Sequence, residues 1–281
     1  MRINEHVHLI RKEFWVTSKV KRYINIYLIT GRNCYLIDSG VAGSETEIAE
    51  YMESIGRCLN DIKGIFLTHS HPDHAGAAAA IKRLTECKIY APCMELSWIE
   101  NIQKQFEERP IPNFYQLLSE SVHVDEPLCD GEKIQLENGL MIHAVATPGH
   151  SHGSMSFVLN SNTVFTGDAI PTADDLPIFI DFEESIKSLD IIYSLDKIEY
   201  YCPAWDHVYN KEKLKEVVKN SKTMLCRFKE SVIQVEREFA EQTEDEKNKE
   251  VLRRAEILQF CGNPLVKKSI EACRKRVRKK L

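Results

Sequence analysis

Residues 68–76 read THSHPDHAG and place three histidines and one aspartate within six positions. The stretch directly follows an apolar run, Ile65-Phe66-Leu67, that predicts a short buried strand. Side chains two apart on a strand lie on the same side, and Pro72 stiffens the turn that follows. Neutral imidazoles and carboxylates are ligands of zinc, iron and manganese. The stretch therefore predicts four metal ligands: His69, His71, Asp73 and His74.

Further ligands are expected downstream, because a metal site needs more residues than one turn supplies. A histidine lies in the turn TPGHSHGS, an aspartate follows the strand-like VFTG, and another histidine follows the strand-like YYCP within PAWDH. Each segment alone is a weak signal, whereas their order after the first cluster is a strong one. They add three candidate ligands: His150, Asp168 and His207.

The composition is that of an ordinary globular protein, with 43% hydrophobic and 28% charged residues among 281. A formal net charge of −5 argues against a nucleic-acid-binding surface over the whole molecule. No window reaches the roughly 18 apolar residues of a membrane span, and the N-terminal MRINEHVHLIRKEF lacks the apolar core of a signal peptide. Nine cysteines, an odd number without a Cys-x-x-Cys pair, favour a reducing cytoplasm.

The first 210 residues alternate strand-like and helix-like segments, which is typical of an α/β domain. Residues 23–38 predict two strands around the turn Gly31-Arg32-Asn33. Ser44-Glu45-Thr46-Glu47 matches a capping box, which would open a helix that reaches about Cys58. Later strands are expected at 65–68, 88–91, 132–136, 140–146, 155–159, 163–166 and 200–203, with helices at 75–84 and 183–196.

Residues 211–281 predict a C-terminal helical extension, distinct from the domain of residues 1–210. Apolar residues four and three apart indicate one long helix with a stripe: Leu214, Val218, Leu225, Phe228, Val232, Val235 and Phe239. The stripe packs either on the main domain or against a second chain, which would make a homodimer. A second helix is expected from Thr243 to Gly262, and Asn263-Pro264 should open a third.

The last eight residues, RKRVRKKL, carry six positive charges. A basic helix end is usually solvated and complements the helix dipole. Binding to nucleic acid or to anionic lipid is the alternative interpretation.

The motif set resembles that of the metallo-β-lactamase-fold hydrolases over roughly residues 5–210. The resemblance rests on Asp38 in LIDSG and on the segments THSHPDHAG, TPGHSHGS, TGDA and PAWDH. It implies a four-layer αβ/βα sandwich with metals at one edge, between the two sheets. The last segment departs from the family, where Pro-Gly-His is more common than PAWDH.

By resemblance, the chain binds two divalent transition metals, with zinc as the first expectation and iron or manganese as the others. One metal is held by His69, His71 and His150. The second is held by Asp73, His74 and His207, and Asp168 bridges the two. Asp38 is expected to bond to a ligating histidine rather than to a metal. At His152 relatives often carry proline, and this histidine is taken as a substrate-facing residue, with support of a ligand or no role at all as the alternatives.

The chemistry expected of such a site is hydrolysis. Two cations about 3.5–4 Å apart share one water, lower its pKa and turn it into a metal-bridging hydroxide that attacks a carbonyl or a phosphorus. The negative charge of Asp168 offsets the repulsion between the cations. Asp73 and Asp38 are the expected catalytic carboxylates, Asp73 as a shuttle of a proton to the leaving group.

Several branches of the family fit poorly. β-Lactamases commonly lack a histidine at the position of His74 and use cysteine where Asp168 stands, and lactonases acting on acyl-homoserine lactones often carry a tyrosine soon after that aspartate. Glyoxalase II-like and thioesterase-like enzymes remain, which cleave an ester, a thioester such as a hydroxyacylglutathione, or a lactone. The alternatives are a phosphodiesterase of the same fold and a non-catalytic metal-binding regulatory protein.

The substrate contacts are less defined by sequence. The long segment 92–128 contains Trp98, Phe106 and Arg109, and is either a pair of helices packed on the sandwich or a lid over the metals. Trp205, two residues before His207, is expected to form a wall of the substrate pocket. The expected partner is a small acyl substrate.

Overall fold

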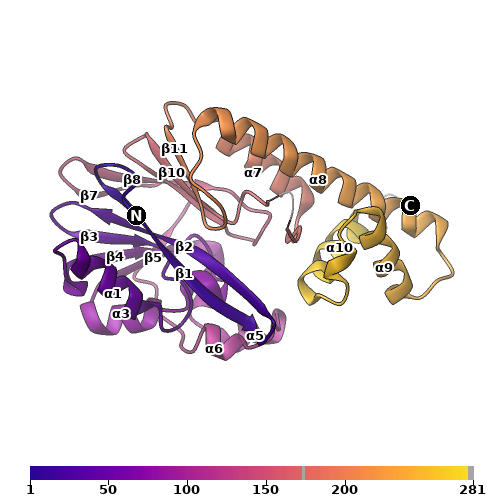
Figure 1. The fold of residues 1–281 in the computed structure, drawn as a ribbon, viewed down its shortest axis with the longest axis horizontal. Coiled ribbons are helices and arrows are strands. Elements are labelled where there is room, and N and C mark those ends of the chain that lie inside the picture. The colour runs from indigo at the N-terminus through magenta and orange to yellow at the C-terminus, as the bar shows by residue number, and fades with distance from the viewer. Residues whose placement is uncertain (173–174, 278–281) are drawn as a thin grey trace.

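The computed structural model describes residues 1–172 and 175–277, and its β-strands form two sheets that lie face to face (Figure 1). In spatial order, the first sheet contains β1 Val7–Thr17, β2 Val20–Thr30, β3 Cys34–Ile37, β4 Ile62–Phe66, β5 Lys88–Pro92 and β6 Glu126–Leu128. Strands β1 to β3 pair antiparallel, whereas β3 to β6 pair parallel. The turn at residues 31–33 joins β2 to β3, as the sequence predicts.

The second sheet runs from β11 through β10, β9 and β8 to β7. Its strands are β7 Lys133–Glu137, β8 Leu140–Ala146, β9 Met155–Leu159, β10 Thr163–Gly167 and β11 Tyr200–Pro203. Strands β7 to β10 form an antiparallel meander, and β11 lies parallel to β10 after the crossover helix α7 Phe182–Ser194.

Helices cover the outer face of each sheet, which gives the expected four layers. Figure 1 shows α1 Ser44–Ser54 and α3 Ala78–Thr85 beside the first sheet, and α7 beside the second. The shorter helices near the first sheet are α2 Pro72–Ala75, α4 Leu96–Ile99, α5 Ile102–Glu108 and α6 Phe114–Leu117. Short 3₁₀ turns occur at Leu59–Asp61, Cys93–Glu95 and Leu258–Phe260.

Large side chains fill the space between the sheets. Phe66 of β4 stacks on Tyr90 at a ring-centroid distance of 4.3 Å and meets the edge of Phe157 from the second sheet at 5.5 Å. Tyr27 and Phe165 make a similar contact across the sheets at 5.2 Å. Because most of these rings are fully or almost fully buried, they fix the two sheets, and so the loops at their edge, relative to one another.

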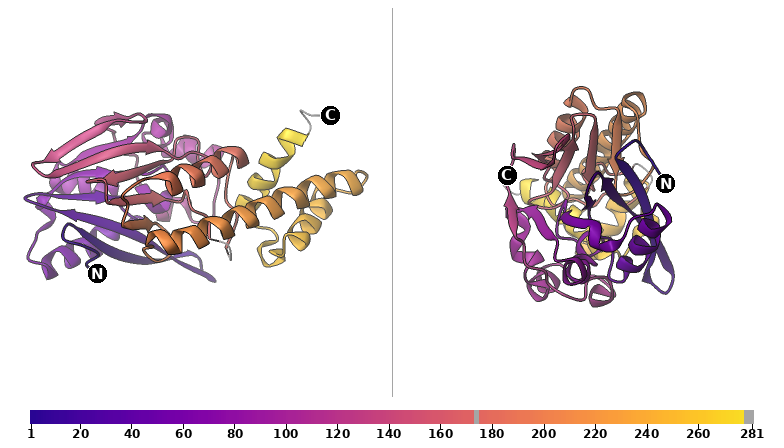
Figure 2. Two further views of the ribbon diagram at one scale, coloured as in Figure 1. Left: turned by 90° about the horizontal axis from the view of Figure 1, so that it is seen from above. Right: turned by 90° about the vertical axis from the view of Figure 1, so that its left-hand side faces the viewer.

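The C-terminal extension folds onto the second sheet. It consists of α8 Lys211–Glu238, α9 Glu244–Arg254 and α10 Pro264–Val277 (Figure 2). The apolar stripe of α8 lies in the same hydrophobic cluster as Val164 and Tyr201 of the sheet and Ile192 of α7. The stripe is therefore buried within one chain, as in the first of the two interpretations, and needs no second chain to cover it.

Three details of the helix boundaries differ from the sequence prediction. Ser44 is the first residue of α1, and Gly43, with φ +89°, is its N-cap, so the predicted capping box does not form. The helix then ends at Ser54 and not near Cys58. Likewise α9 ends at Arg254, well before Gly262. The Thr243 capping box and the start of α10 at Pro264 are confirmed.

The basic tail is described in part. Arg274 is buried and forms ion pairs with Glu236 and Glu244. The side chains of 275–281 lie outside the described residues, so the interpretation of the tail as a binding segment stays a hypothesis.

Candidate metal centre

Most of the predicted ligands follow strands that end at one edge of the sandwich. Asp38 follows β3, residues 68–74 follow β4, and Asp168 follows β10. The carboxyl ends of neighbouring parallel strands meet at the same edge, where α/β proteins commonly bind ligands. The two sheets touch there, because a Cβ on Gly167 (φ +50°) would lie 2.6 Å from Oγ1 of Thr68.

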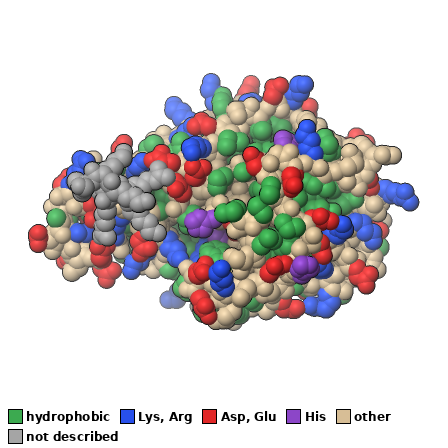
Figure 3. Space-filling view, turned by 180° about the vertical axis from the view of Figure 1, so that it is seen from behind, with side chains coloured by type: hydrophobic (Ala, Val, Ile, Leu, Met, Phe, Trp, Pro, Cys, Tyr) green, Lys and Arg blue, Asp and Glu red, His purple; other side chains and the backbone are tan. Residues whose placement is uncertain are grey.

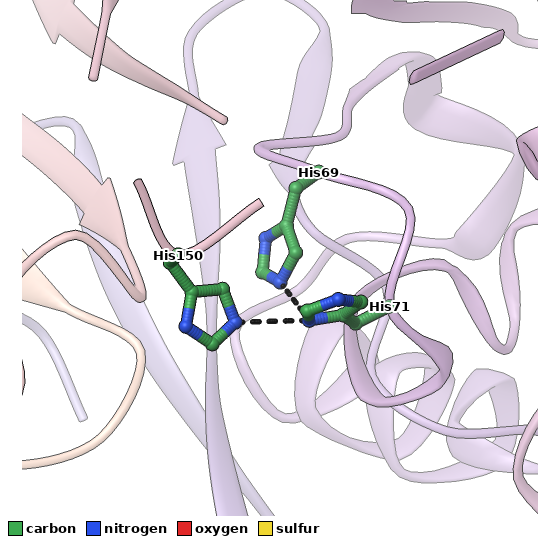
Figure 4. A group of neighbouring side chains, drawn as sticks. All are labelled: His69, His71 and His150. Atoms are coloured by element: carbon green, nitrogen blue, oxygen red, sulfur yellow. Dashed lines mark hydrogen bonds between the residues drawn. The ribbon is translucent and has the colours of Figure 1, made fainter. Parts of the chain in front are cut away.

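Three imidazoles converge at this edge (Figure 4). Nδ1 of His71 lies 2.9 Å from Nε2 of His69 and 2.9 Å from Nε2 of His150. All three side chains are buried. His150 is oriented from its other side, where its Nδ1 lies 3.0 Å from the carbonyl oxygen of Ile178. The arrangement presents three nitrogen atoms to one small volume, as a tetrahedral metal site requires.

Burial also sets the charge of these imidazoles. Burial is the main cause that lowers the pKa of His69 and of His71 well below the ordinary value, and the neighbouring positive groups lower it further. Burial lowers the pKa of His150 too, although Asp168 opposes that shift. Histidines that stay neutral at pH 7 have a free lone pair, which is the form that binds a metal.

A second group of ligand atoms adjoins the first. Nε2 of His74 lies 3.1 Å from Oδ1 of Asp168 and 3.8 Å from Oδ2 of Asp73. The other oxygen of Asp168, Oδ2, lies 3.2 Å from Nε2 of His150. Asp168 thus presents one carboxylate oxygen to each group, which is the geometry that a bridging ligand needs. The trio His69, His74 and Asp168 also places its ligand atoms within 4.8 Å of one another.

Unpaired polar atoms show that cations fit this site. Nε2 of His74 and Oδ1 of Asp168 are buried, and neither has a well-aligned hydrogen-bond partner among the described residues. An unsatisfied buried polar atom is costly, and a metal ion that both atoms bind would remove that cost. Burial opposes the charge on His74, but Asp168, Asp38 and Asp73 together raise its pKa well above the ordinary value. Positive charge is therefore favoured at this point.

Asp38 contacts His74 on the side of the ring that faces away from Asp168 and orients it. Its carboxylate lies 2.7 Å from Nδ1 of His74 and accepts the backbone N–H of Thr68 at 2.7 Å. The hydroxyl of Thr68 lies within hydrogen-bond distance of the same carboxylate. A carboxylate that holds the outer nitrogen of a ligating histidine fixes the tautomer and the ring orientation. Asp38 is therefore placed to orient the ring of His74.

A buried glutamate that sequence reasoning missed joins the two ligand loops. Glu95 accepts hydrogen bonds from Ser70 of the first loop and from Ser151 and the backbone N–H of Gly153 in the second. The residue is 4% exposed. In the sequence, the role of Glu95 is marked only by its position shortly after a strand. Many surface glutamates have the same position, so the sequence did not single it out.

His207 does not join the other predicted ligands. Its side chain is 85% exposed, and its Nε2 lies 3.9 Å from its neighbour Asp206. Asp206 has φ +137°, and its side chain bonds to the His207 N–H and to the hydroxyl of Tyr209. The segment PAWDH thus directs His207 to solvent, and Trp205 takes the place beside Asp168. We leave His207 out of the ligand set on this ground.

A cavity opens from the metal centre, and we call it the main cavity. It is lined by His71, Asp73, His150, Asp168 and Trp205 and by apolar side chains: Phe14, Val16, Ile111, Ile170, Leu176 and Leu265. A second hollow, the side cavity, shares His71 and His150 and adds Trp98, His152 and Lys268. Residues of the segment 92–128 and of the C-terminal extension therefore form walls of both.

The molecular surface agrees with this description. In the space-filling view, histidine reaches the surface near the middle of the face shown, and hydrophobic side chains gather next to it (Figure 3). Trp205 packs against Phe14 and Tyr23 at centroid distances of 6.4 Å and 6.1 Å. Trp205 and His152 thus lie at the walls of cavities that reach the metal centre.

Comparison with known proteins identifies the family. Residues 20–205 match the family model of the metallo-beta-lactamase superfamily, which is more than half of the chain. The chain belongs to this superfamily. A probable metallo-hydrolase of Methanocaldococcus jannaschii is 31% identical over 189 residues, which cover 64% of this chain and 85% of that protein. Within the superfamily, the chain is a metal-dependent hydrolase.

Two further relatives carry more specific names. A probable polyketide biosynthesis zinc-dependent hydrolase of Bacillus velezensis is 26% identical, over 69% of this chain and 78% of its own length. An atrochrysone carboxyl ACP thioesterase of Aspergillus fumigatus is 29% identical, over 52% of this chain and 29% of its own length.

Among solved structures, a metallo-beta-lactamase family protein of Thermus thermophilus superposes with a TM-score of 0.71 at 17% identity. The superposition covers 98% of this chain and 94% of that one, so it includes the C-terminal helices. The two proteins thus share their fold over nearly the whole of both chains. In the described residues, no helix combines the length and the hydropathy that crossing a membrane requires.

Proposed function

We propose that this hydrolase uses two divalent transition metals, zinc in the first place, to cleave an acyl thioester, with esters and lactones as related substrates. The observation that carries the proposal is the position of Asp168, which presents Oδ1 to His74 at 3.1 Å and Oδ2 to His150 at 3.2 Å. A carboxylate placed in this way offsets the charge of two cations at once.

The proposed ligand set follows from the two groups of atoms. His69, His71 and His150 hold the first metal, and His74 with Asp73 holds the second. When bound, the metals lower the pKa of a water molecule from about 15.7 toward about 7 and polarise the carbonyl of the substrate. Nδ1 of His74 carries the proton and donates it in a hydrogen bond to Asp38. The other ring nitrogen, Nε2, is therefore free to bind a metal.

Asp73 and the walls of the main cavity have further roles in the proposed reaction. Besides holding the second metal, Asp73 lines the main cavity, and we propose that its carboxylate takes up a proton from the attacking water and passes it to the leaving group. The apolar wall of Phe14, Ile111 and Leu265 suits the hydrocarbon part of an acyl group. Trp205 adds an aromatic face between that wall and Asp168.

The relatives support the acyl substrate class. One is named a thioesterase and another a zinc-dependent hydrolase, and both names agree with the resemblance found in the sequence. The expected partner is thus a small acyl molecule. We further propose a reducing, cytoplasmic location, in which the nine cysteines stay reduced.

A hydrolysis screen tests the proposal. Purified protein, loaded with zinc, iron or manganese, is assayed on thioesters, esters, lactones, phosphodiesters and β-lactams at equal concentrations. The proposal expects an acyl substrate, with thioesters first, to be cleaved fastest. Faster cleavage of phosphodiesters would favour the phosphodiesterase, and no cleavage by fully loaded protein would favour the regulatory protein.

A further inference from the structure

Arg109 is a positively charged side chain beside the metal centre that has no direct partner among the described residues. Arg109 follows α5, is 8% exposed, and lines both the main cavity and the side cavity. Among the described residues, its guanidinium group makes no hydrogen bond and no ion pair within 4.0 Å. A guanidinium group carries five N–H donors. None of these donors is among the fully buried unpaired polar atoms, so they reach the space of the two cavities, where a ligand can accept them.

The nearby carboxylates do not satisfy Arg109. Glu95 is occupied by Ser70, Ser151 and Gly153, and Asp73 and Asp168 are ligands in the proposed function. Burial lowers the pKa of Arg109 to about 10, and these three carboxylates oppose the shift from a distance. The group therefore stays positively charged at pH 7 and is available to a molecule in the cavity.

A second arginine in the main cavity shows the contrast. Arg22 forms a two-pronged ion pair with Asp175, with N–O distances of 2.6 Å and 2.8 Å. The N–H donors of Arg22 are thus paired with Asp175, and this ion pair forms part of the cavity wall. Arg109, deeper and unpaired, has the same fork of donors free.

We propose that Arg109 binds an oxyanion of the substrate, so that this hydrolase prefers acyl substrates that carry a carboxylate or a phosphate as well as an apolar chain. The planar fork of arginine matches the two oxygen atoms of either group. Arg109 shares its cavity with His71 and with the apolar residues Ile111 and Leu265, so an anionic head and a hydrocarbon part fit the same space. This inference rests on the proposed function for the identity of the reacting bond.

The first test measures binding and needs no turnover. Zinc-loaded full-length protein is titrated in a calorimeter with glutarate, with butyl phosphate and with the uncharged pentanamide. Binding of a probe to the metals contributes equally in all variants. A difference in affinity between the wild type and a variant therefore measures the contribution of Arg109. We expect glutarate or butyl phosphate, but not pentanamide, to bind at least tenfold more weakly to Arg109→Gln than to the wild type. The stronger of the two anions identifies the preferred oxyanion.

A matched pair of substitutions controls for folding and for net charge. Arg109→Lys and Arg22→Lys make the same chemical change in the same cavity, and both keep the positive charge. We expect anion affinity to fall at least threefold in Arg109→Lys and to stay within twofold in Arg22→Lys. If Arg109→Gln does not fold, this pair carries the test. Equal effects of the two lysine variants, or none, would overturn the inference.

The second test separates this inference from the proposed function. The ratio of kcat/KM for S-glutaryl- and S-pentanoyl-N-acetylcysteamine is measured for the wild type and for Arg109→Gln. We expect the wild type to prefer the glutaryl thioester, and the preference to fall at least tenfold in the variant. Turnover of both thioesters with an unchanged ratio would overturn the role of Arg109 and leave the thioesterase proposal standing. Arg109-dependent binding of an anion without thioester turnover would support the oxyanion site and contradict the thioesterase proposal.

Discussion

Nδ1 of His74 lies 2.7 Å from Oδ2 of Asp38, and both side chains are buried. The contact joins the carboxyl end of β3 to the loop after β4, and it turns the free nitrogen of His74 toward Asp168. The geometry of the second group of ligand atoms thus depends on a residue that touches no metal in the proposed arrangement.

Replacing Asp38 tests that dependence. In Asp38→Asn, only one terminal atom of the amide can accept, so it cannot accept both the N–H of His74 at the position of Oδ2 and the backbone N–H of Thr68 at the position of Oδ1, and the tautomer of the imidazole is less firmly fixed. We expect a 10–100-fold loss in activity or in affinity for one metal, the range typical of such supporting residues. Competition with a chelator, with metal content read by mass spectrometry, measures the affinity. Unchanged retention of both metals would show that the contact is dispensable.

Replacing Asp168 should be more severe. Asp168→Asn keeps the shape but removes the charge and one oxygen ligand between the two groups. Metal content should fall toward one per chain, and activity should fall by about a hundredfold or more, because a direct ligand matters at least as much as a supporting one.

Asp206→Asn is the matched control, since the Asp206 side chain bonds to the His207 N–H and the Tyr209 hydroxyl and, among the described residues, to no ligand candidate. Both variants are loaded with metal under identical conditions. If Asp206→Asn loses metal and activity while Asp168→Asn keeps both, the assignment of the bridging residue is wrong.

His207 gives a prediction of the opposite kind. Because its side chain is 85% exposed, His207→Ala should keep metal content and turnover within about twofold of the wild type. His150→Ala, which removes a buried ligand candidate, should lose most of both. A loss of one metal in His207→Ala would mean that the loop after β11 reaches the centre when metals bind.

Glu95 should contribute to stability and to metal retention. Its carboxylate is buried and accepts from three residues of the two ligand loops. In Glu95→Gln, one terminal atom becomes a donor that faces other donors, so we expect a loss of about 2–3 kcal/mol in the free energy of unfolding. Urea unfolding measures it, with the exposed Glu107→Gln as the control. Equal stabilities of the two variants would contradict the role assigned to Glu95.

The C-terminal helices should be inseparable from the fold. Phe228 of α8 is 1% exposed and packs against Phe179 at a centroid distance of 5.8 Å. Phe228→Ala should lower the free energy of unfolding by about 3–5 kcal/mol, whereas the exposed Leu258→Ala should change it by less than about 1 kcal/mol. Deleting residues 211–281 should expose the apolar residues that α8 covers, among them Val164 of β10 and Ile192 of α7, and make the protein insoluble. A truncated protein that stays soluble, monomeric and equally active would show that the extension is independent.

The sequence predicted what is local and missed what depends on distant contacts. His69, His71 and His74 could be found because they lie within one turn, and the strand pattern predicted where most of the sheet residues fall. Glu95 and Arg109 belong to no pattern, and their roles come from burial beside loops far along the chain. His207 followed the family pattern, but the segment PAWDH changes the path of the loop, and spacing alone does not reveal that.

The metal content of the purified protein tests the central claim most directly. Plasma mass spectrometry of full-length protein, reconstituted with zinc, iron or manganese and freed of loose metal, gives the number of ions per chain. We expect close to two for the wild type, and about one for Asp168→Asn. Fewer than one ion per chain in the wild type, after loading with each of the three metals, would contradict the dinuclear centre on which the proposed hydrolysis depends.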